Sequence, residues 1–152
     1  MTDWPGRHLN LAEFISTWSK DPSTKVGAVL FRRDGSIISM GYNGFPRGVN
    51  DDPALMADRD IKLKMTIHAE ENAILAAVRN GSTVEGACLA VTHHPCSQCA
   101  AKLSQAGIRY IHYRADNDFE HRWADDISMA RHIFNQLGII HIRVDEEGNR
   151  SV

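Results

Sequence analysis

Hydrophobic residues recur at intervals of three or four positions in three long stretches of this chain, which is the spacing of one face of an α-helix. In the first stretch, Leu11, Ile15 and Trp18 share such a face, and the expected helix ends before Asp21-Pro22. A further helical segment begins at Pro95, because proline is favoured at the first position of a helix. We therefore expect four helices, at residues 6–20, 66–80, 95–105 and 123–137.

Shorter apolar runs lie between the expected helices and have the length of β-strands. The first two runs flank Asp34-Gly35, a dipeptide typical of the tight turn of a β-hairpin. Each of the other three runs follows a helix. The expected strands cover residues 25–33, 36–42, 87–92, 108–113 and 139–144, and residues 145–152 form a polar tail.

The order α-β-β-α-β-α-β-α-β predicts an α/β fold in three layers (α-β-α), with helices on both faces of one sheet. We expect a mixed sheet of five strands, in which an N-terminal antiparallel hairpin is followed by parallel strands. No internal repeat or linker divides the sequence, so a single domain is expected over residues 1–152.

The segment at residues 43–65 shows no clear hydrophobic period and contains two glycines and two prolines. A connection of this length in a compact domain is usually functional, for example as a lid or as one wall of a site. Its basic side chains, Arg47 among them, could meet a phosphate group. The simpler interpretation, a solvated loop with scattered charges, stays open.

The charge balance argues against a dedicated nucleic-acid-binding protein. The chain has 152 residues, of which 43% are hydrophobic and 24% charged, and its formal net charge is −2 with no basic cluster. No apolar run approaches the ~20 residues of a membrane span, and the first residues lack the layout of a signal peptide. We expect a cytoplasmic protein that has neither a membrane nor a nucleic acid as partner.

Two short motifs carry the candidate chemistry, His68-x-Glu70 and Pro95-Cys96-x-x-Cys99. A Cys-x-x-Cys pair alone fits a redox dithiol as well as a metal site. The upstream histidine and carboxylate favour the metal, because three soft ligands, an open position for water and a proton carrier make a hydrolytic zinc site. H-x-E followed by P-C-x-x-C is also the signature of zinc deaminases, in which the glutamate is not a ligand.

Both motifs fall in the first turn of an expected helix, where the helix dipole stabilises thiolates and carboxylates. Residues two apart on a helix point about 200° away from each other. His68 and Glu70 are therefore expected on two sides of a water molecule, whereas Cys96 and Cys99 share a face. One zinc ion on His68, Cys96 and Cys99 would lower the pKa of that water toward ~7. Glu70 would then move its proton to the base and to the departing ammonia, while the Ala69 backbone N–H holds the carbonyl of the base.

A closed, purely structural zinc site is the alternative to a catalytic one. It needs a fourth ligand, and His93 or His94 could serve only in a strained loop because they are close to Cys96 in sequence. Cys88 is expected to be a small core residue, and Glu71 a solvated helix residue outside the chemistry. The isolated histidines are expected to be surface or half-buried residues: His8, His112, His132 and His141.

Four stretches together resemble the deoxycytidylate (dCMP) deaminases of the cytidine-deaminase-like superfamily. Two of them contain the zinc motifs, at residues 68–74 and 95–108, and a third covers residues 19–28. The fourth stretch, at residues 41–48, begins Gly-Tyr-Asn-Gly and narrows the resemblance to the dCMP deaminases. The resemblance implies a cytidine-deaminase-like fold, and hydrolysis of dCMP to dUMP and ammonia, which supplies dUMP for thymidylate synthesis.

The same resemblance implies roles for residues outside the zinc motifs. Asn43 is expected to contact the sugar or the base. An aromatic residue after the fourth strand is expected to lie over the pyrimidine, with Phe119 the first candidate and Trp123 the second. Arg79 resembles a family position near a subunit interface and its phosphate contacts. Family members are usually homo-oligomers, here expected to be a hexamer or a dimer, and many are activated by dCTP and inhibited by dTTP.

The resemblance also bears on the number of metal ions and on the substrate. The loop at residues 49–52 contains no cysteine or histidine that could hold a second zinc, so a single, catalytic zinc is predicted. The substrate could still be dCTP, CMP or a 5-substituted dCMP, and rival deaminases of the superfamily act on tRNA adenosine, guanine or a riboflavin precursor. A non-catalytic zinc-stabilised binding module is the alternative of another class. Glu70 argues against it, because a structural site has no use for an acid beside the metal.

Overall fold

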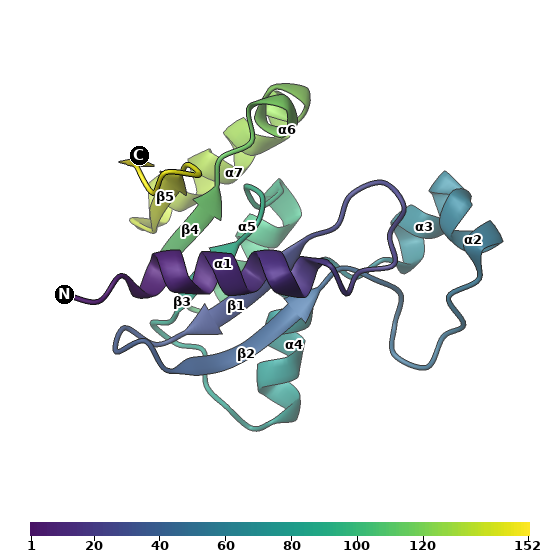
Figure 1. Ribbon diagram of the computed structural model, residues 1–152, viewed down its shortest axis with the longest axis horizontal. Coiled ribbons are helices and arrows are strands. Elements are labelled where there is room, and N and C mark those ends of the chain that lie inside the picture. The colour runs from purple at the N-terminus through teal and green to yellow at the C-terminus, as the bar shows by residue number, and fades with distance from the viewer.

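The computed structural model of the chain, residues 1–152, contains one six-stranded β-sheet with the spatial order β2-β1-β3-β4-β5-β6 (Figure 1). The strands are β1 (Gly27–Phe31), β2 (Ile37–Tyr42), β3 (Cys88–Val91), β4 (Tyr110–Arg114), β5 (Ile140–Val144) and β6 (Arg150–Ser151). β3, β4 and β5 are parallel, whereas β1 is antiparallel to both of its neighbours. This arrangement confirms the mixed sheet expected from the order of the elements.

The expected number of five strands is wrong, because the polar tail contains β6. After a turn in which the Asp145 N–H donates to the Asn149 carbonyl (3.0 Å), Arg150 and Ser151 pair antiparallel with β5. Both residues of β6 are exposed. A strand of two exposed residues has no hydrophobic alternation, so periodicity gave no sign of it.

Helices cover both faces of the sheet. On one face, α1 (Trp4–Ser16) packs Leu9, Ala12 and Ile15 against the sheet. The other face carries α4 (Ala69–Arg79), α5 (Ser97–Gln105) and α7 (Ala124–Leu137), whose buried residues join the largest core cluster. The predicted three layers are therefore present, with the helices divided one against three. None of the helices is both long and apolar enough to cross a membrane.

Two glycines allow helices to lie directly on the sheet. A Cβ atom at Gly27 would lie 1.9 Å from the Ala12 carbonyl oxygen, so α1 packs against bare backbone of β1. A Cβ atom at Gly41 would lie 2.5 Å from the Ala69 carbonyl oxygen and 2.6 Å from the Ala73 nitrogen. The beginning of α4 is thereby held against the end of β2, and this contact places the first of the two motifs.

Three short helices lie in segments where no periodic pattern predicts them: α2 (Pro53–Ala57), α3 (Arg59–Met65) and α6 (Asn117–Arg122). Each has at most one buried residue, which explains the missing apolar period. Each begins after an aspartate whose carboxylate accepts a backbone N–H: Asp52, Asp58 and Asp116. An aspartate N-cap is thus the sequence signal that was available for these helices. α2 and α3 project away from the sheet (Figure 1).

The segment that contains α2 and α3 is closed at its base. Gly44 and Ile67 form an isolated antiparallel bridge, in which the Gly44 N–H donates to the Ile67 carbonyl (3.1 Å) and the Ile67 N–H to the Gly44 carbonyl (2.8 Å). The stretch that follows β2 therefore lies beside the residue that precedes His68.

The isolated histidines are more buried than expected. His8, His112 and His141 are 4%, 6% and 7% exposed, and only His132 of this group lies at the surface. The His8 ring stacks on Trp4, lies tilted against Phe31 and bonds the Gly35 carbonyl through Nε2 (2.9 Å). The His8 ring thus packs among aromatic side chains, which the sequence pattern did not reveal.

Candidate metal centre

The two motifs begin two neighbouring helices on the same face of the sheet. His68 is the N-cap residue of α4 and Cys96 that of α5, and both have extended backbones. Cys99 lies within the first turn of α5. Because His68 precedes the helix, the expected angle of about 200° between His68 and Glu70 does not describe their directions. Its extended backbone sends the imidazole toward α5, and Glu70 lies inside the first turn of α4.

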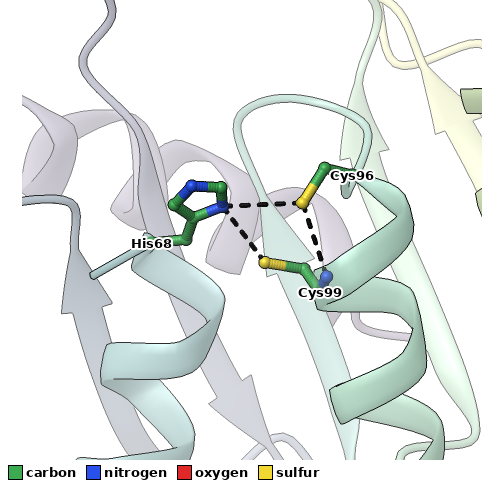
Figure 2. Close-up of side chains that lie close together, drawn as sticks. All are labelled: His68, Cys96 and Cys99. Carbon is green, nitrogen blue, oxygen red and sulfur yellow. Dashed lines mark hydrogen bonds between the residues drawn. The ribbon is translucent and has the colours of Figure 1, made fainter. Parts of the chain in front are cut away.

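The side chains of His68, Cys96 and Cys99 converge (Figure 2). The His68 Nδ1 atom lies 3.5 Å from the Cys96 sulfur and 3.3 Å from the Cys99 sulfur. The three possible ligand atoms all lie within 4.8 Å of one another. Cys99 is fully buried, Cys96 is half-buried and the His68 ring is partly exposed, so the cluster opens toward solvent on one side.

These distances fit a zinc ion. Nitrogen and sulfur ligands at about 2.0 and 2.3 Å from a tetrahedral zinc are about 3.5 Å from each other. A donor set of one imidazole and two thiols also favours zinc over magnesium or calcium, because those two ions prefer oxygen ligands. His68, Cys96 and Cys99 therefore form a candidate site for one zinc ion.

Contacts from other elements fix the start of α5. The carboxylate of Asp126, on α7, accepts the Ser97 backbone N–H (2.9 Å) and the Ser97 hydroxyl (2.6 Å). Lys102 of α5 pairs with Glu71 of α4 at 3.0 Å, which joins the two helices that carry the cluster. The Cys99 thiol also lies 3.9 Å from a Glu71 oxygen. Glu71, expected to be solvated, is thus a half-buried link between the helices.

The cluster perturbs the ionisation of its own members. Hydrogen bonds from the Cys99 thiol and from His68 lower the pKa of Cys96 to about 4. The same thiolate raises the pKa of His68 to about 9, and the shared hydrogen bond together with burial raises the pKa of Cys99. A bound cation competes with protons for these same three ligand atoms.

Glu70 lies deep beside the cluster, with only 5% of its surface exposed. Burial is the main cause that raises the pKa of its carboxyl group to about 7, and the nearby Cys96 thiolate acts in the same direction. A carboxyl group with such a pKa can both accept and donate a proton near neutral pH. The preceding backbone N–H, that of Ala69, is a first-turn donor without an acceptor inside the helix.

His93 and His94 are not among the three converging side chains, and each ring has other partners. The His94 ring packs edge-on against Tyr113 at 4.6 Å, and its Nδ1 atom bonds the Pro95 carbonyl at 2.8 Å. Burial lowers the pKa of His94 to about 4, so the ring is neutral. The His93 ring stacks on Phe119. Neither ring therefore supplies the fourth ligand that a closed, purely structural zinc site needs.

Asn43 lies at the end of β2, and 6% of it is exposed. Its side-chain oxygen accepts the Val26 N–H at 2.8 Å, and its side-chain nitrogen donates to the Thr24 carbonyl at 2.8 Å. An amide group has two further hydrogen-bonding positions, one on each atom. The expected contact with a sugar or a base thus stays a prediction, and the structure shows that Asn43 first fixes the segment before β1.

The two candidate aromatic residues differ in their surroundings. Phe119, on α6, stacks on the His93 ring with the ring centres 4.4 Å apart and the planes 19° apart. Trp123 follows α6, lies 6.4 Å from the Phe119 ring and is 46% exposed. His93, Asp116 and Glu120, which contact or fix Phe119, were not predicted; the only available signal was Asp116 as a helix N-cap.

The two candidate phosphate-contacting arginines are exposed and lie on different segments of the fold. Arg47 belongs to the loop that follows β2. Arg79 is the last residue of α4, which places it about 14 Å along the helix axis from Glu70 at 1.5 Å per residue. Within one chain, Arg79 therefore does not meet a molecule bound at the cluster.

Comparison with known proteins agrees with this geometry. Residues 2–115 match the family model described as the cytidine and deoxycytidylate deaminase zinc-binding region. A deaminase from the luxG 3' region of Aliivibrio fischeri is 44% identical over 140 residues, covering 91% of this chain and 92% of that protein. The human deoxycytidylate deaminase is 32% identical over 142 residues, covering 90% and 77%.

A solved structure shares the fold over almost its full length. The dCMP deaminase of the cyanophage S-TIM5, in complex with dCMP and dUMP, superimposes with a TM-score of 0.75 at 27% identity and covers 95% of this chain and 99% of that chain. The fold, the His-Cys-Cys cluster and the buried glutamate thus define a zinc-dependent hydrolase of the deaminase class. The chain belongs to the cytidine and deoxycytidylate deaminase family, as the sequence motifs predicted.

Proposed function

We propose that this protein deaminates dCMP to dUMP and ammonia with one catalytic zinc ion, and so supplies dUMP for thymidylate synthesis. The observation that carries the proposal is the buried carboxylate of Glu70 beside the converging His68, Cys96 and Cys99 side chains. A structural zinc site has no need of such an acid. The choice of dCMP is supported by the named dCMP deaminases among the relatives and by the S-TIM5 enzyme, which was solved with dCMP and dUMP.

The residues have separate roles in this proposal. His68, Cys96 and Cys99 hold the metal, which when bound supplies a water molecule of lowered pKa as nucleophile. Glu70 takes one proton from this water and delivers it to the ring nitrogen beside the attacked carbon. It then takes the second proton from the hydroxyl group now on that carbon and passes it to the amine, which leaves as ammonia. The Ala69 backbone N–H holds the carbonyl of the base.

The remaining contacts would select the nucleotide. Phe119, or Trp123 as the second candidate, lies over the pyrimidine, and Asn43 contacts the sugar or the base. Arg47 is the candidate for the phosphate because its exposed guanidinium group belongs to the loop that follows Asn43. We further propose that the protein is a homo-oligomer in which Arg79 lies near a subunit interface, and that dCTP and dTTP regulate it.

Substitution of Glu70 by glutamine tests the mechanism. The change keeps the shape of the side chain but removes the proton carrier, so we expect kcat for dCMP to fall by about 10²–10⁴-fold. The zinc content, measured by elemental analysis, should stay at one ion per chain. Glu13→Gln is the matched control, because it removes an exposed carboxylate on α1 and should leave kcat unchanged.

Ammonia release from dCMP, dCTP, CMP and 5-methyl-dCMP, with and without dCTP and dTTP as effectors, tests the substrate. We expect dCMP to have the highest kcat/KM. Full activity of Glu70→Gln would contradict the mechanism. A zinc-loaded wild-type protein that releases no ammonia from any cytosine nucleotide would instead support another base as substrate or the binding-module alternative.

A further inference from the structure

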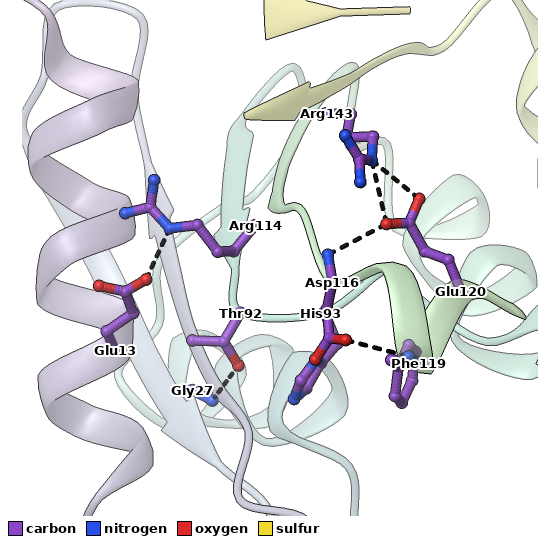
Figure 3. Close-up of polar contacts among 9 residues, drawn as sticks. All are labelled: Glu13, Gly27, Thr92, His93, Arg114, Asp116, Phe119, Glu120 and Arg143. Atoms are coloured by element: carbon purple, nitrogen blue, oxygen red, sulfur yellow. Dashed lines mark hydrogen bonds and ion pairs between the residues drawn. The ribbon is translucent and has the colours of Figure 1, made fainter. Parts of the chain in front are cut away.

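We propose that Arg143 and Glu120 are positioning residues, which hold α6 so that the Phe119 ring stays beside the substrate side of the metal centre. Neither residue belongs to a zinc motif, and both act through other groups. This inference rests on the proposed function, because it concerns how the base of the nucleotide is held. Figure 3 shows the contacts among Arg143, Glu120, Asp116 and Phe119.

The helix that carries Phe119 has little packing of its own. α6 spans Asn117–Arg122, only six residues, and none of them is buried. A helix of this length is unstable by itself, because the cost of its first turn is recovered only through many later residues or through tertiary contacts. Something outside α6 must therefore keep it in place.

The first fixed point is the Asp116 N-cap. Its carboxylate accepts the Phe119 backbone N–H at 3.0 Å, and its own backbone N–H donates to the Glu120 carboxylate at 3.0 Å. The two ends of the first turn thus bond each other in the manner of a capping box. The second of these bonds depends on where the Glu120 side chain lies.

Arg143 fixes the Glu120 side chain. Its Nε atom lies 3.1 and 3.0 Å from the two Glu120 oxygens, and its Nη2 atom donates to the Asn117 side-chain oxygen at 2.6 Å. Arg143 belongs to β5, so it links α6 to the sheet at two positions. The side chains of Glu120 and Arg143 are 16% and 27% exposed, and ion pairs shielded in this way are screened less by salt than surface pairs.

The fixed first turn of α6 places the Phe119 ring against the segment between β3 and Cys96. The ring stacks on His93, which lies between the end of β3 and the ligand Cys96. The His93 Nδ1 atom also faces the Asp116 carboxylate at 3.8 Å. A chain of contacts therefore runs from β5 through Glu120 and α6 to the Phe119–His93 stack, which stands within three residues of a zinc ligand. Stacking on an aromatic ring raises the affinity for a bound base by about 5- to 150-fold.

Loss of the pair should impair binding of the base and spare the chemistry. In Glu120→Ala or Arg143→Ala, we expect KM for dCMP to rise roughly five- to tenfold, the lower part of the range that base stacking supports. We expect kcat to stay within about twofold and zinc content to be unchanged, because no ligand and no proton carrier is touched. The double variant should raise KM by less than the product of the two single changes, since both variants lose the Arg143–Glu120 contact. Arg143→Lys, which keeps the charge but loses the two-point geometry, should lie between Arg143→Ala and the wild type.

Glu13→Ala is the control, because it breaks a similar ion pair elsewhere. Arg114 at the end of β4 donates to Glu13 of α1 at 2.6 Å, and this pair, on the left of Figure 3, does not contact α6. The KM of Glu13→Ala for dCMP should equal that of the wild type. Hydrogen exchange of the zinc-loaded protein gives a readout without substrate: the Phe119 amide should exchange faster in Glu120→Ala and at the wild-type rate in Glu13→Ala.

The two hypotheses fail in different ways. If the wild type deaminates dCMP but Glu120→Ala and Arg143→Ala keep its KM, or if their effects on KM simply add, the positioning role is wrong. An unchanged Phe119 exchange rate in Glu120→Ala would also overturn it. If the wild type deaminates no cytosine nucleotide, the proposed function fails, and the exchange rates still report whether the pair holds α6.

Discussion

The His112 ring, on β4, is 6% exposed, and its Nδ1 atom has no hydrogen-bond partner. Burial lowers its pKa to about 4, and Arg150 acts in the same direction while Asp3 opposes it. The folded protein therefore keeps this imidazole neutral at a pH where an unfolded chain would protonate it. His112, which has no role in the proposed reaction, thus makes the free energy of unfolding depend on pH.

The sign of this link follows from the two pKa values. Between pH 6.5 and pH 4 the unfolded state binds a proton at His112 that the folded state does not, so the free energy of unfolding decreases as the pH falls. We expect His112 to contribute about 1–2 kcal/mol to the decrease between pH 6.5 and 5. Urea unfolding of His112→Phe should show a shallower pH dependence than the wild type. The exposed His132→Gln is the control, and equal slopes in His112→Phe and the wild type would contradict the assignment.

The individual residues of the zinc cluster could be predicted from sequence because their spacing alone restricts the chemistry. A histidine, a glutamate two positions later and a Cys-x-x-Cys pair have few uses other than a hydrolytic metal site. The Arg143–Glu120 pair could not be found in this way. It joins positions 23 residues apart whose types are common on any surface, and only the packing of β5 beside α6 brings them together.

At the scale of elements, the approach of α4 to β2 places His68 and Glu70. A methyl group at Gly41 would collide with backbone atoms of Ala69 and Ala73, which cannot move as a flexible side chain can. The helix must therefore shift, and its first turn carries the buried carboxyl group of Glu70. The contact makes a glycine outside the zinc motifs a determinant of the site.

Gly41→Ala should lower the free energy of unfolding by about 1–3 kcal/mol, since overpacking forces backbone shifts of this cost. Denaturant unfolding of the zinc-loaded protein measures it. Gly44→Ala is the matched control for stability, because a Cβ atom there has no neighbour within 4 Å and the change should stay within about 0.5 kcal/mol. Equal stabilities of the two variants would show that α4 can move away from β2 without cost.

The elements that periodicity predicted are those that bury a face. α4, α5 and α7 supply residues to one core cluster, and their positions agree with the sequence pattern to within a few residues. α2, α3 and α6 bury at most one residue each, so no apolar stripe marks them. Their aspartate N-caps are present in the sequence, but they do not identify a helix, because a single aspartate also begins many turns.

At the scale of the whole molecule, the metal centre joins parts of the chain that the sheet keeps apart in sequence. His68 enters from the helix that packs on the hairpin, and Cys96 and Cys99 enter from the helix that follows β3. An ion that binds only the folded arrangement stabilises it by mass action. Zinc should therefore stabilise the entire fold as well as serve the reaction.

Removal of zinc by a strong chelator should lower the melting temperature by roughly 10 °C, if the free zinc concentration exceeds the dissociation constant about a thousandfold. Calorimetry with and without chelator measures the shift. Cys99→Ala is the internal control: it should melt near the temperature of the chelated wild type and show no further change with chelator. A wild-type melting temperature that chelator leaves unchanged would mean that the ion does not hold the two helices together.

The order of elements was sufficient to predict a three-layer fold with a mixed sheet, because hairpins and strand–helix–strand units have few permitted connections. The sixth strand escaped prediction for a physical reason. β6 is two residues long and adds no buried side chain, so only its backbone hydrogen bonds with β5 define it.

The bridge between Gly44 and Ile67 joins the two ends of the intervening segment and so forms the neck of a closed loop. The entropy cost of such a loop grows slowly with length, by about 0.6 kcal/mol for each doubling. Residues can therefore be gained or lost near its tip while the neck, and His68 next to it, keep their places. The length of this segment can therefore change, in evolution or by protein engineering, independently of the metal centre.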